Sequence, residues 1–161
     1  MTDPDPAAGK RDVAGVPVPP PLIYVAGLAA GGLAELVRST TGPPRSVSVT
    51  IAIVGVLAWL ALDGLAAMRF SRAGTPVIPF KPSTALVVDG PYRISRNPIY
   101  LGMAALYVGL AFLFGLMWAL LFMPFVLIAV DRLVIAREEP YLERKFGQDY
   151  VEYKKRVRRW I

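Results

Sequence analysis

The longest uncharged stretch of the chain, residues 99–130, constrains the fold more than any other feature. It contains 32 residues without Asp, Glu, Lys or Arg. A membrane-spanning helix needs about 20 apolar residues, so this stretch is too long for one ordinary span. Gly115 interrupts it near its middle. We therefore expect two helices, at residues 98–114 and 116–136, joined by a tight turn.

Two further apolar segments precede this stretch. Residues 22–37 contain Glu35, and residues 47–68 contain Asp63 as their one charged residue. Hydrophobic residues make up 55% of the 161 residues, which is too many for an ordinary soluble domain. The sequence predicts an all-α integral membrane bundle of about four transmembrane helices. Asp63 lies near the end of its helix, so a capping or interfacial role is favoured over a buried functional acid.

The predicted membrane domain covers residues 22–161. Residues 1–21 are rich in Pro, Ala, Gly and Asp and are expected to form a mobile N-terminal tail. They do not resemble a cleaved signal peptide, because acidic residues come first and the apolar segment starts late. Residues 69–98 are polar and rich in proline, which favours an extended loop lying on the membrane over another helix.

The distribution of cations predicts the orientation. Four spans would place 16 of the 18 Lys and Arg residues on one side, with Arg38 and Arg45 on the other. Cytoplasmic segments carry an excess of Lys and Arg, so both termini, the 69–98 loop and any site near them are expected to be cytoplasmic. The predicted location is the plasma membrane of a bacterium. Because topology explains the net charge of +6, no nucleic-acid partner is expected.

The C-terminal region is charged but patterned. Aromatic and apolar residues recur at spacings of four and three, which is typical of an amphipathic helix; these residues are Phe146, Tyr150, Tyr153, Val157 and Trp160. Such a helix could lie on anionic lipid or pack on the rest of the domain. Gly147 is expected to separate it from the preceding helix.

The available chemistry is restricted because the sequence contains no His and no Cys. Thiol nucleophiles, imidazole bases and the usual zinc sites are therefore excluded, and no metal site is predicted. Any chemistry must use carboxylates, Arg, Lys, Tyr, Ser or Thr. It must also suit a reaction that needs no strong general base.

Residues 90–102 form a basic, turn-rich loop that runs into the long apolar stretch. Asn97 is a favourable helix N-cap and Pro98 suits the first helical position. The helix start beside Arg96 would attract an anion. The pair Glu138 and Glu139 lies on the same side, so the two elements could clamp a zwitterionic amino-acid group. The alternative is that these charges only pair with one another at the membrane surface.

Four blocks occur in a recognisable order. They are Gly-Pro-Tyr-Arg at 90–93, Arg-Asn-Pro-x-Tyr-x-Gly at 96–102, Glu-Glu-x-x-Leu at 138–142, and Phe-Gly-x-x-Tyr-x-x-Tyr at 146–153, followed by Val157. Over residues 75–161 this order resembles the isoprenylcysteine carboxyl methyltransferase and phospholipid methyltransferase superfamily. Those proteins usually have His at the position of Asn97. Asn can cap a helix and bind a ligand, but it cannot carry a proton.

The resemblance implies a small membrane methyltransferase that uses S-adenosylmethionine. It implies a cofactor cradle between residues 96–102 and the acidic pair, beneath the helix at 150–157. The cofactor-binding candidates are Gly90, Tyr92, Asn97, Pro98, Ile99, Tyr100, Leu101, Gly102, Glu138 and Glu139.

The absence of His and Cys also bears on the methyl acceptor. A carboxylate is already ionised at neutral pH and needs an arginine partner, for which Arg96, Arg132 and Arg137 are the catalytic candidates. A thiol ionises with modest help, whereas a lipid ammonium must first lose a proton. A lipophilic carboxylate or thiol is therefore preferred to phospholipid N-methylation, the alternative within the superfamily. Two other readings are a noncatalytic lipid-binding scaffold and a membrane reductase, although no Gly-rich dinucleotide loop is present.

Overall fold

The computed structural model describes residues 13–78 and 80–161. Four long helices form the body of the molecule: α2 (Pro20–Val37), α3 (Arg45–Arg72), α4 (Pro98–Phe114) and α5 (Met117–Val130). A 3-10 turn, η1 (Gly90–Arg93), precedes α4. After α5 come a π-helical turn, η2 (Asp131–Ile135), and the helices α6 (Ala136–Phe146) and α7 (Gln148–Arg156). The prediction of an all-α fold is confirmed.

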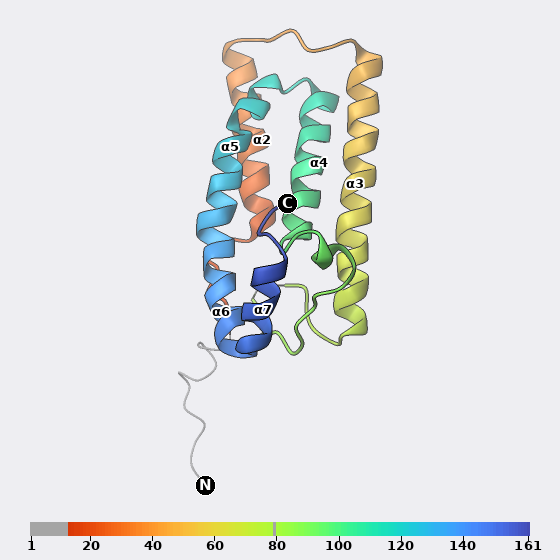
Figure 1. The fold of residues 1–161 in the computed structure, drawn as a ribbon. Helices are drawn as coiled ribbons and strands as arrows, with labels where there is room; N and C mark the ends of the chain where they lie inside the picture. The colour runs from red at the N-terminus through yellow and green to blue at the C-terminus, as the bar shows by residue number, and fades with distance from the viewer. Residues whose placement is uncertain (1–12, 79) are drawn as a thin grey trace.

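The long helices stand side by side as a bundle (Figure 1). Helix α3 packs along α4, and α2 packs along α5. In the described ranges, three helical stretches are long and apolar enough to cross a membrane: Pro20–Val37, Arg45–Arg72 and Met117–Phe146. Helix α4 is shorter, and its 17 residues span about 25 Å against a hydrocarbon core of about 30 Å. The chain is an integral membrane protein.

Small residues bring the helices into close contact. A Cβ atom added at Gly55 of α3 would meet the Ala105 carbonyl oxygen of α4 at 2.6 Å. A Cβ atom at Gly31 of α2 would come within 2.5 Å of the backbone of Ala119 in α5. The buried Tyr107 fills the interior between the helices, and its hydroxyl donates to the Ala119 carbonyl at 2.7 Å. Close backbone approach is the usual means of packing helices in lipid.

The predicted boundaries of α4 are confirmed. Pro98 occupies the first helical position, and Gly115 ends the helix with a φ of 69°, a left-handed conformation that suits glycine. The helix predicted at 116–136 instead continues through η2 into α6 and ends at Phe146. Gly147, with a φ of 55°, then separates α6 from α7, as the sequence predicted.

Polar contacts within the α3–α4 connection and to α3 and α6 hold it in place. The buried Thr75 accepts from the Thr84 backbone N–H at 2.9 Å, and the Ser83 N–H donates to the Tyr141 hydroxyl at 2.9 Å. Arg69 and Asp89 form an ion pair of 2.7 Å. The loop therefore lies against α6 and the end of α3, beside α7 at one end of the bundle (Figure 1).

The N-terminal segment is only partly described. The first twelve residues of the predicted mobile tail lie outside the described residues. The following residues lie against the bundle, because Val16 is buried in its core and the Gly15 carbonyl accepts a hydrogen bond of 3.0 Å from Arg137. In residues 13–19, the tail therefore packs on the domain.

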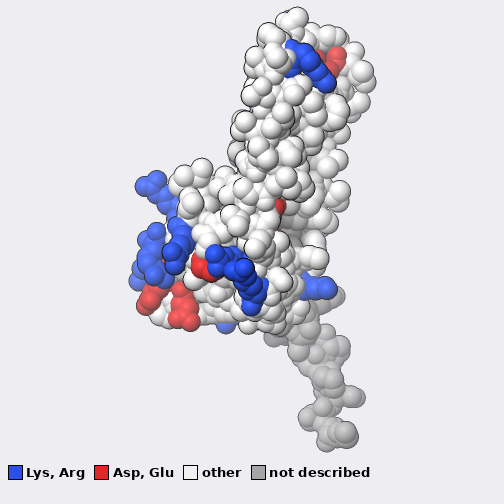
Figure 2. All heavy atoms as spheres, turned by 90° about the vertical axis from the view of Figure 1, so that its right-hand side faces the viewer, with Lys and Arg blue, Asp and Glu red and all other residues white. Residues whose placement is uncertain are grey.

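Charged side chains gather at the two ends of a long body, and the surface between them is almost free of charge in this view (Figure 2). The larger group lies at the end that carries α6 and α7. The helix ends at the opposite side carry Glu35, Arg38 and Arg45. This distribution places the polar end, with its loop and two short helices, at one membrane surface.

Candidate functional site

A cavity of about 110 Å³ lies at the polar end, between the α3–α4 loop, the start of α4, and helices α6 and α7. Its apolar wall comes largely from the loop, α6 and α7, including Leu86, Val87, Leu142, Tyr150 and Tyr153. Its charged lining comprises Lys81, Arg96, Glu138 and Glu139. A mostly apolar cavity with a few converging polar groups is typical of a small-molecule site.

The structure brings together part of the predicted set. The predicted residues that line the cavity are Tyr92, Arg96, Asn97, Ile99, Tyr100, Glu138 and Glu139. Pro98, Leu101 and Gly102 lie in the first turns of α4 but outside the lining. A Cβ at Gly102 would overlap the Asp63 carboxylate, so Gly102 makes room for α3. Gly90, with a φ of 61°, packs against Arg69.

Two of the three predicted catalytic arginines lie away from the cavity. Arg132 has a side chain that is 79% exposed and sits 3.9 Å from Asp131. Arg137 donates to the Gly15 carbonyl. Of the three, Arg96 is the one that lines the cavity. Among the described residues, Glu139 pairs with Arg96 and Arg159 and not with Arg132 or Arg137.

Glu138 and Glu139 have different environments, as expected for neighbours on a helix. Glu138 accepts a hydrogen bond of 2.7 Å from the Tyr100 hydroxyl. Among the described residues, it forms no ion pair. Glu139 is buried and is surrounded by cations. The two carboxylates can therefore do different chemical work.

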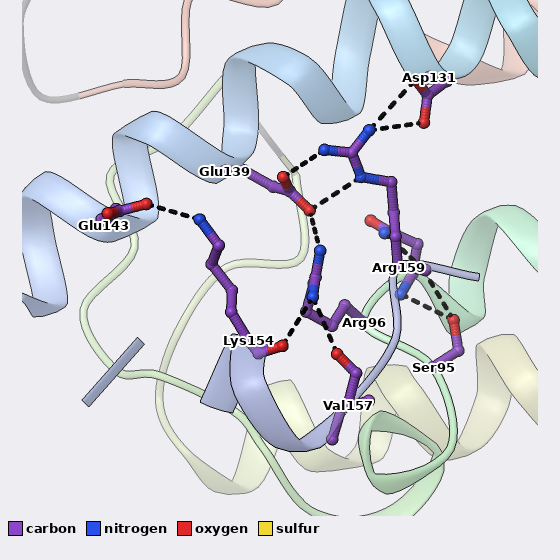
Figure 3. Close-up of polar contacts among 9 residues, drawn as sticks. Ser95, Arg96, Asp131, Glu139, Glu143, Lys154, Val157 and Arg159 are labelled. Atoms are coloured by element: carbon purple, nitrogen blue, oxygen red, sulfur yellow. Dashed lines mark hydrogen bonds and ion pairs between the residues drawn. The ribbon is translucent and has the colours of Figure 1, made fainter. Parts of the chain in front are cut away.

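Glu139 of α6 is the centre of an ion network that also includes the segment before α4, the segment after α7, and η2 (Figure 3). Its Oε1 atom accepts from Arg96 Nη2 at 2.6 Å, and its Oε2 atom accepts from Arg159 Nη2 at 2.6 Å. Arg159 also donates to Asp131 Oδ1 at 3.1 Å. These hydrogen bonds raise the pKa of the Arg159 guanidinium, with the Glu139 bond as the largest cause. The network contains two cations and two anions and is therefore neutral.

Arg96 is held from several sides. Its Nη1 atom donates to the carbonyls of Val157 at 2.8 Å and Lys154 at 3.2 Å, at the end of α7 (Figure 3). Its Nε atom is buried and has no hydrogen-bond partner among the described residues. A buried donor without a partner is costly unless a ligand or water satisfies it. The Arg96 Nε–H is therefore available to a ligand or a water.

The side chain of Asn97 does not cap α4, contrary to the sequence prediction. Asn97 occupies the N-cap position, but its Nδ2 atom donates to the Arg159 carbonyl at 2.9 Å. The Ser95 hydroxyl donates to the same carbonyl at 3.2 Å and accepts from the Asn97 N–H at 3.0 Å. The amide thus ties the start of α4 to the segment after α7.

The aromatic stripe of α7 faces the protein. Tyr150 and Tyr153 are buried and pack with Val87 and Tyr92, and the Tyr153 hydroxyl donates to the Tyr92 carbonyl at 2.8 Å. Burial raises the pKa of Tyr92, Tyr150 and Tyr153 well above the usual value. Of the two interpretations of this helix, packing on the domain is confirmed. These phenols stay protonated and are hydrogen-bond donors at neutral pH.

Sequence reasoning missed three contributors to the site. Arg159 belongs to the charged C-terminal region, and Ser95 carries no motif of its own. The cavity-lining residues at 76–78 and 81–87 fall in the stretch that was predicted only as an extended polar loop. The signal for the loop was its apolar run from Ala85 to Val88. The signal for Arg159 was weaker, since the partners of a surface arginine depend on the tertiary fold.

The comparisons with known proteins agree with this arrangement. The model of the family described as phospholipid methyltransferase matches residues 45–149, well over half of the chain. A Haemophilus influenzae protein described as uncharacterized is 51% identical over 35 residues. That match covers 22% of this chain and 56% of the relative's length. No solved structure matches the chain at a significant level. Because the family match covers most of its length, this chain belongs to the phospholipid methyltransferase family.

Proposed function

We propose that this protein is a membrane methyltransferase that uses S-adenosylmethionine and methylates a lipophilic carboxylate or thiol. The observation that carries the proposal is a carboxylate without a cation. Glu138 lines the cavity with a hydrogen bond from Tyr100 and, among the described residues, no ion pair. A partly buried anion of this kind favours a positively charged ligand.

The charges of the cavity match the amino-acid end of S-adenosylmethionine. Glu138 would hold the ammonium, and the free Arg96 Nε–H would donate to the carboxylate. Because the Glu139 network is neutral by itself, Glu138 and the exposed Lys81 are the charged lining residues that lie outside it. The apolar and aromatic residues of the loop and α7 would enclose the remainder of the molecule.

When bound, this cofactor supplies a methyl group activated by a sulfonium. The transfer is an in-line displacement, for which the protein mainly has to position the acceptor and exclude water. Tyr92, Tyr150 and Tyr153 are packed against one another and protonated. They form part of the cavity wall and donate hydrogen bonds, but they do not remove a proton from the methyl acceptor. An acceptor that is already ionised fits this site best.

The choice of acceptor rests on the same chemistry. The sequence contains no His or Cys to act as a base. Lys81 lines the cavity and is exposed, so its ammonium could bind an anionic acceptor. The apolar residues Val77 and Ile78 line the cavity beside it and suit a greasy chain. The site would face the cytoplasm of a bacterium, because the charged end carries most of the Lys and Arg residues.

Labelled methyl transfer tests this function. Membranes containing the protein would be incubated with S-adenosylmethionine labelled in its methyl group, and the lipid extract analysed by mass spectrometry. We expect label in a lipid product with wild type and with the control Glu152→Gln, an exposed acid on α7, and little with Glu138→Gln. Base-labile label would identify a methyl ester, and base-stable label on sulfur a thioether. Label on nitrogen would overturn the proposed acceptor class, and absence of label would overturn the activity.

A further inference from the structure

The segment after α7, residues 157–161, makes many polar contacts with the site, although no recognised motif lies in residues 158–161. The Arg159 guanidinium binds Glu139 through Nε at 3.1 Å and Nη2 at 2.6 Å. Its Nη1 atom binds both oxygens of Asp131, at 3.1 and 3.2 Å. Arg159 therefore bridges η2 and α6 with a planar fork that matches two carboxylates at once.

The backbone of the same segment holds the entrance to α4. The Arg158 carbonyl accepts from the Arg96 N–H at 3.0 Å, and the Arg159 carbonyl accepts from Ser95 and Asn97. Trp160 packs against the core cluster that contains Tyr100. These contacts hold residues 95–97 against the segment after α7 (Figure 3).

The position of Glu139 depends on both arginines. Its side chain is 11% exposed and is shared between Arg96 and Arg159. Without Arg159, Glu139 would keep one cation, and Asp131 would keep the distant Arg132 at 3.9 Å. A partly buried carboxylate with less compensation either moves toward water or draws Arg96 toward itself. Either movement would change the direction of the Arg96 Nε–H and of the neighbouring Glu138.

We propose that Arg159 is a positioning residue: it fixes Glu139 and residues 95–97 so that Glu138 and the Arg96 Nε atom face the ligand. The inference deepens the proposed function and rests on it. Arg159 does not line the cavity, so it acts through Glu139 and Asn97. Lysine cannot replace it fully, because an ammonium is a point charge and cannot bind two carboxylates in one plane.

The first test needs no ligand. Hydrogen exchange of the peptide containing residues 95–97 should be faster in Arg159→Gln than in wild type. The acceptor of the Arg96 N–H is the Arg158 carbonyl, and the segment that carries this carbonyl would lose its side-chain anchor to Glu139 and Asp131. The matched control is Arg156→Gln, an exposed cation at the end of α7, which should exchange like wild type. Equal exchange in wild type and Arg159→Gln would overturn the proposal.

The second test measures binding of S-adenosylhomocysteine by calorimetry. We expect affinity to fall about tenfold or more in Arg159→Gln, as for the loss of charge-assisted hydrogen bonds, and to fall less in Arg159→Lys. In a Glu139→Gln background, Arg159→Gln should add little, since both act on one carboxylate. Wild-type affinity in folded Arg159→Gln would refute the positioning role alone. No binding to wild type would instead refute the proposed function.

One variant guards against misfolding. If Arg159→Gln does not fold, Asp131→Asn provides the test instead. It weakens the contact between Arg159 and Asp131 and leaves Glu139 unchanged. It should lower affinity by a smaller factor than Arg159→Lys does. Unchanged affinity in both Asp131→Asn and Arg159→Lys would contradict the proposal.

Discussion

Arg96 and Glu139 are 43 positions apart in sequence and are joined by a 2.6 Å ion pair whose side chains are each 11% exposed. The pair connects the entrance of α4 to α6, across the cavity that both residues line. Both partners have further hydrogen bonds, so the pair is part of a network. Such networks fix geometry more than they add net stability.

Replacing one member of this pair should destabilise the protein. Arg96→Ala leaves Glu139 with Arg159 as its remaining cation and also frees the Val157 and Lys154 carbonyls. We expect a loss of about 1–3 kcal/mol in the free energy of unfolding. Thermal denaturation in detergent would show it as a lower midpoint. Arg156→Ala is the control, and equal midpoints for Arg96→Ala and wild type would contradict the expectation.

Gly102 and Asp63 should show strong coupling. A methyl group added at Gly102 would overlap the Asp63 carboxylate, whose Oδ2 atom is buried without a hydrogen-bond partner among the described residues. We expect Gly102→Ala to lower stability by about 1–3 kcal/mol, the usual range for overpacking. The double variant Asp63→Ala with Gly102→Ala should recover most of that loss. Additive effects in a double-mutant cycle would show that the two residues do not share this space.

The buried tyrosines should make the folded protein less stable at alkaline pH. Burial raises the pKa of Tyr92, Tyr150 and Tyr153 in the folded state, whereas an unfolded tyrosine ionises near about 10. The unfolded state therefore loses protons first, and stability should be constant at neutral pH and fall above about pH 10. Tyr153→Phe should cost about 1 kcal/mol at pH 7 through its lost hydrogen bond to Tyr92. It should also make the alkaline decline shallower, and an unchanged decline in far-UV circular dichroism melts would argue against this origin.

Orientation can be tested with single cysteines, since the chain has none of its own. Glu152→Cys on α7 and Thr41→Cys in the α2–α3 connection are both at exposed positions. We expect a membrane-impermeant maleimide to label Thr41→Cys in intact cells and Glu152→Cys after permeabilisation. The reverse pattern would place the site outside the cytoplasm.

Local signals in the sequence were sufficient for most of the fold. Pro98, Gly115 and Gly147 each mark a helix boundary by backbone preference, and those boundaries hold. The helix through Asp131 was predicted too short, because the polar residues after it resemble an interface and not a continuing helix. The loop at 69–98 was recognised, but one of the hydrogen bonds that hold it runs to Tyr141, 58 positions further along the chain.

The site was less predictable than the fold. The motif residues Tyr100 and Glu138 do meet, because their blocks lie at the same end of neighbouring helices. The partner of Glu139 could not be chosen from sequence, since four arginines follow it within the same charged region. Asn97 was assigned to its own helix, yet its side chain binds the Arg159 carbonyl, 62 positions away. Such choices depend on tertiary contacts.

The central claim is that Glu138 holds the positive charge of the methyl donor, and calorimetry tests it most directly. Purified protein in detergent or nanodiscs would be titrated with S-adenosylhomocysteine, which keeps the amino-acid group. We predict one binding site in wild type and in Glu152→Gln, and at least a tenfold loss of affinity in folded Glu138→Gln, as for a lost charge-assisted contact of about 1.5–3 kcal/mol. Equal affinity in wild type and Glu138→Gln, or no binding to folded wild type, would contradict the claim.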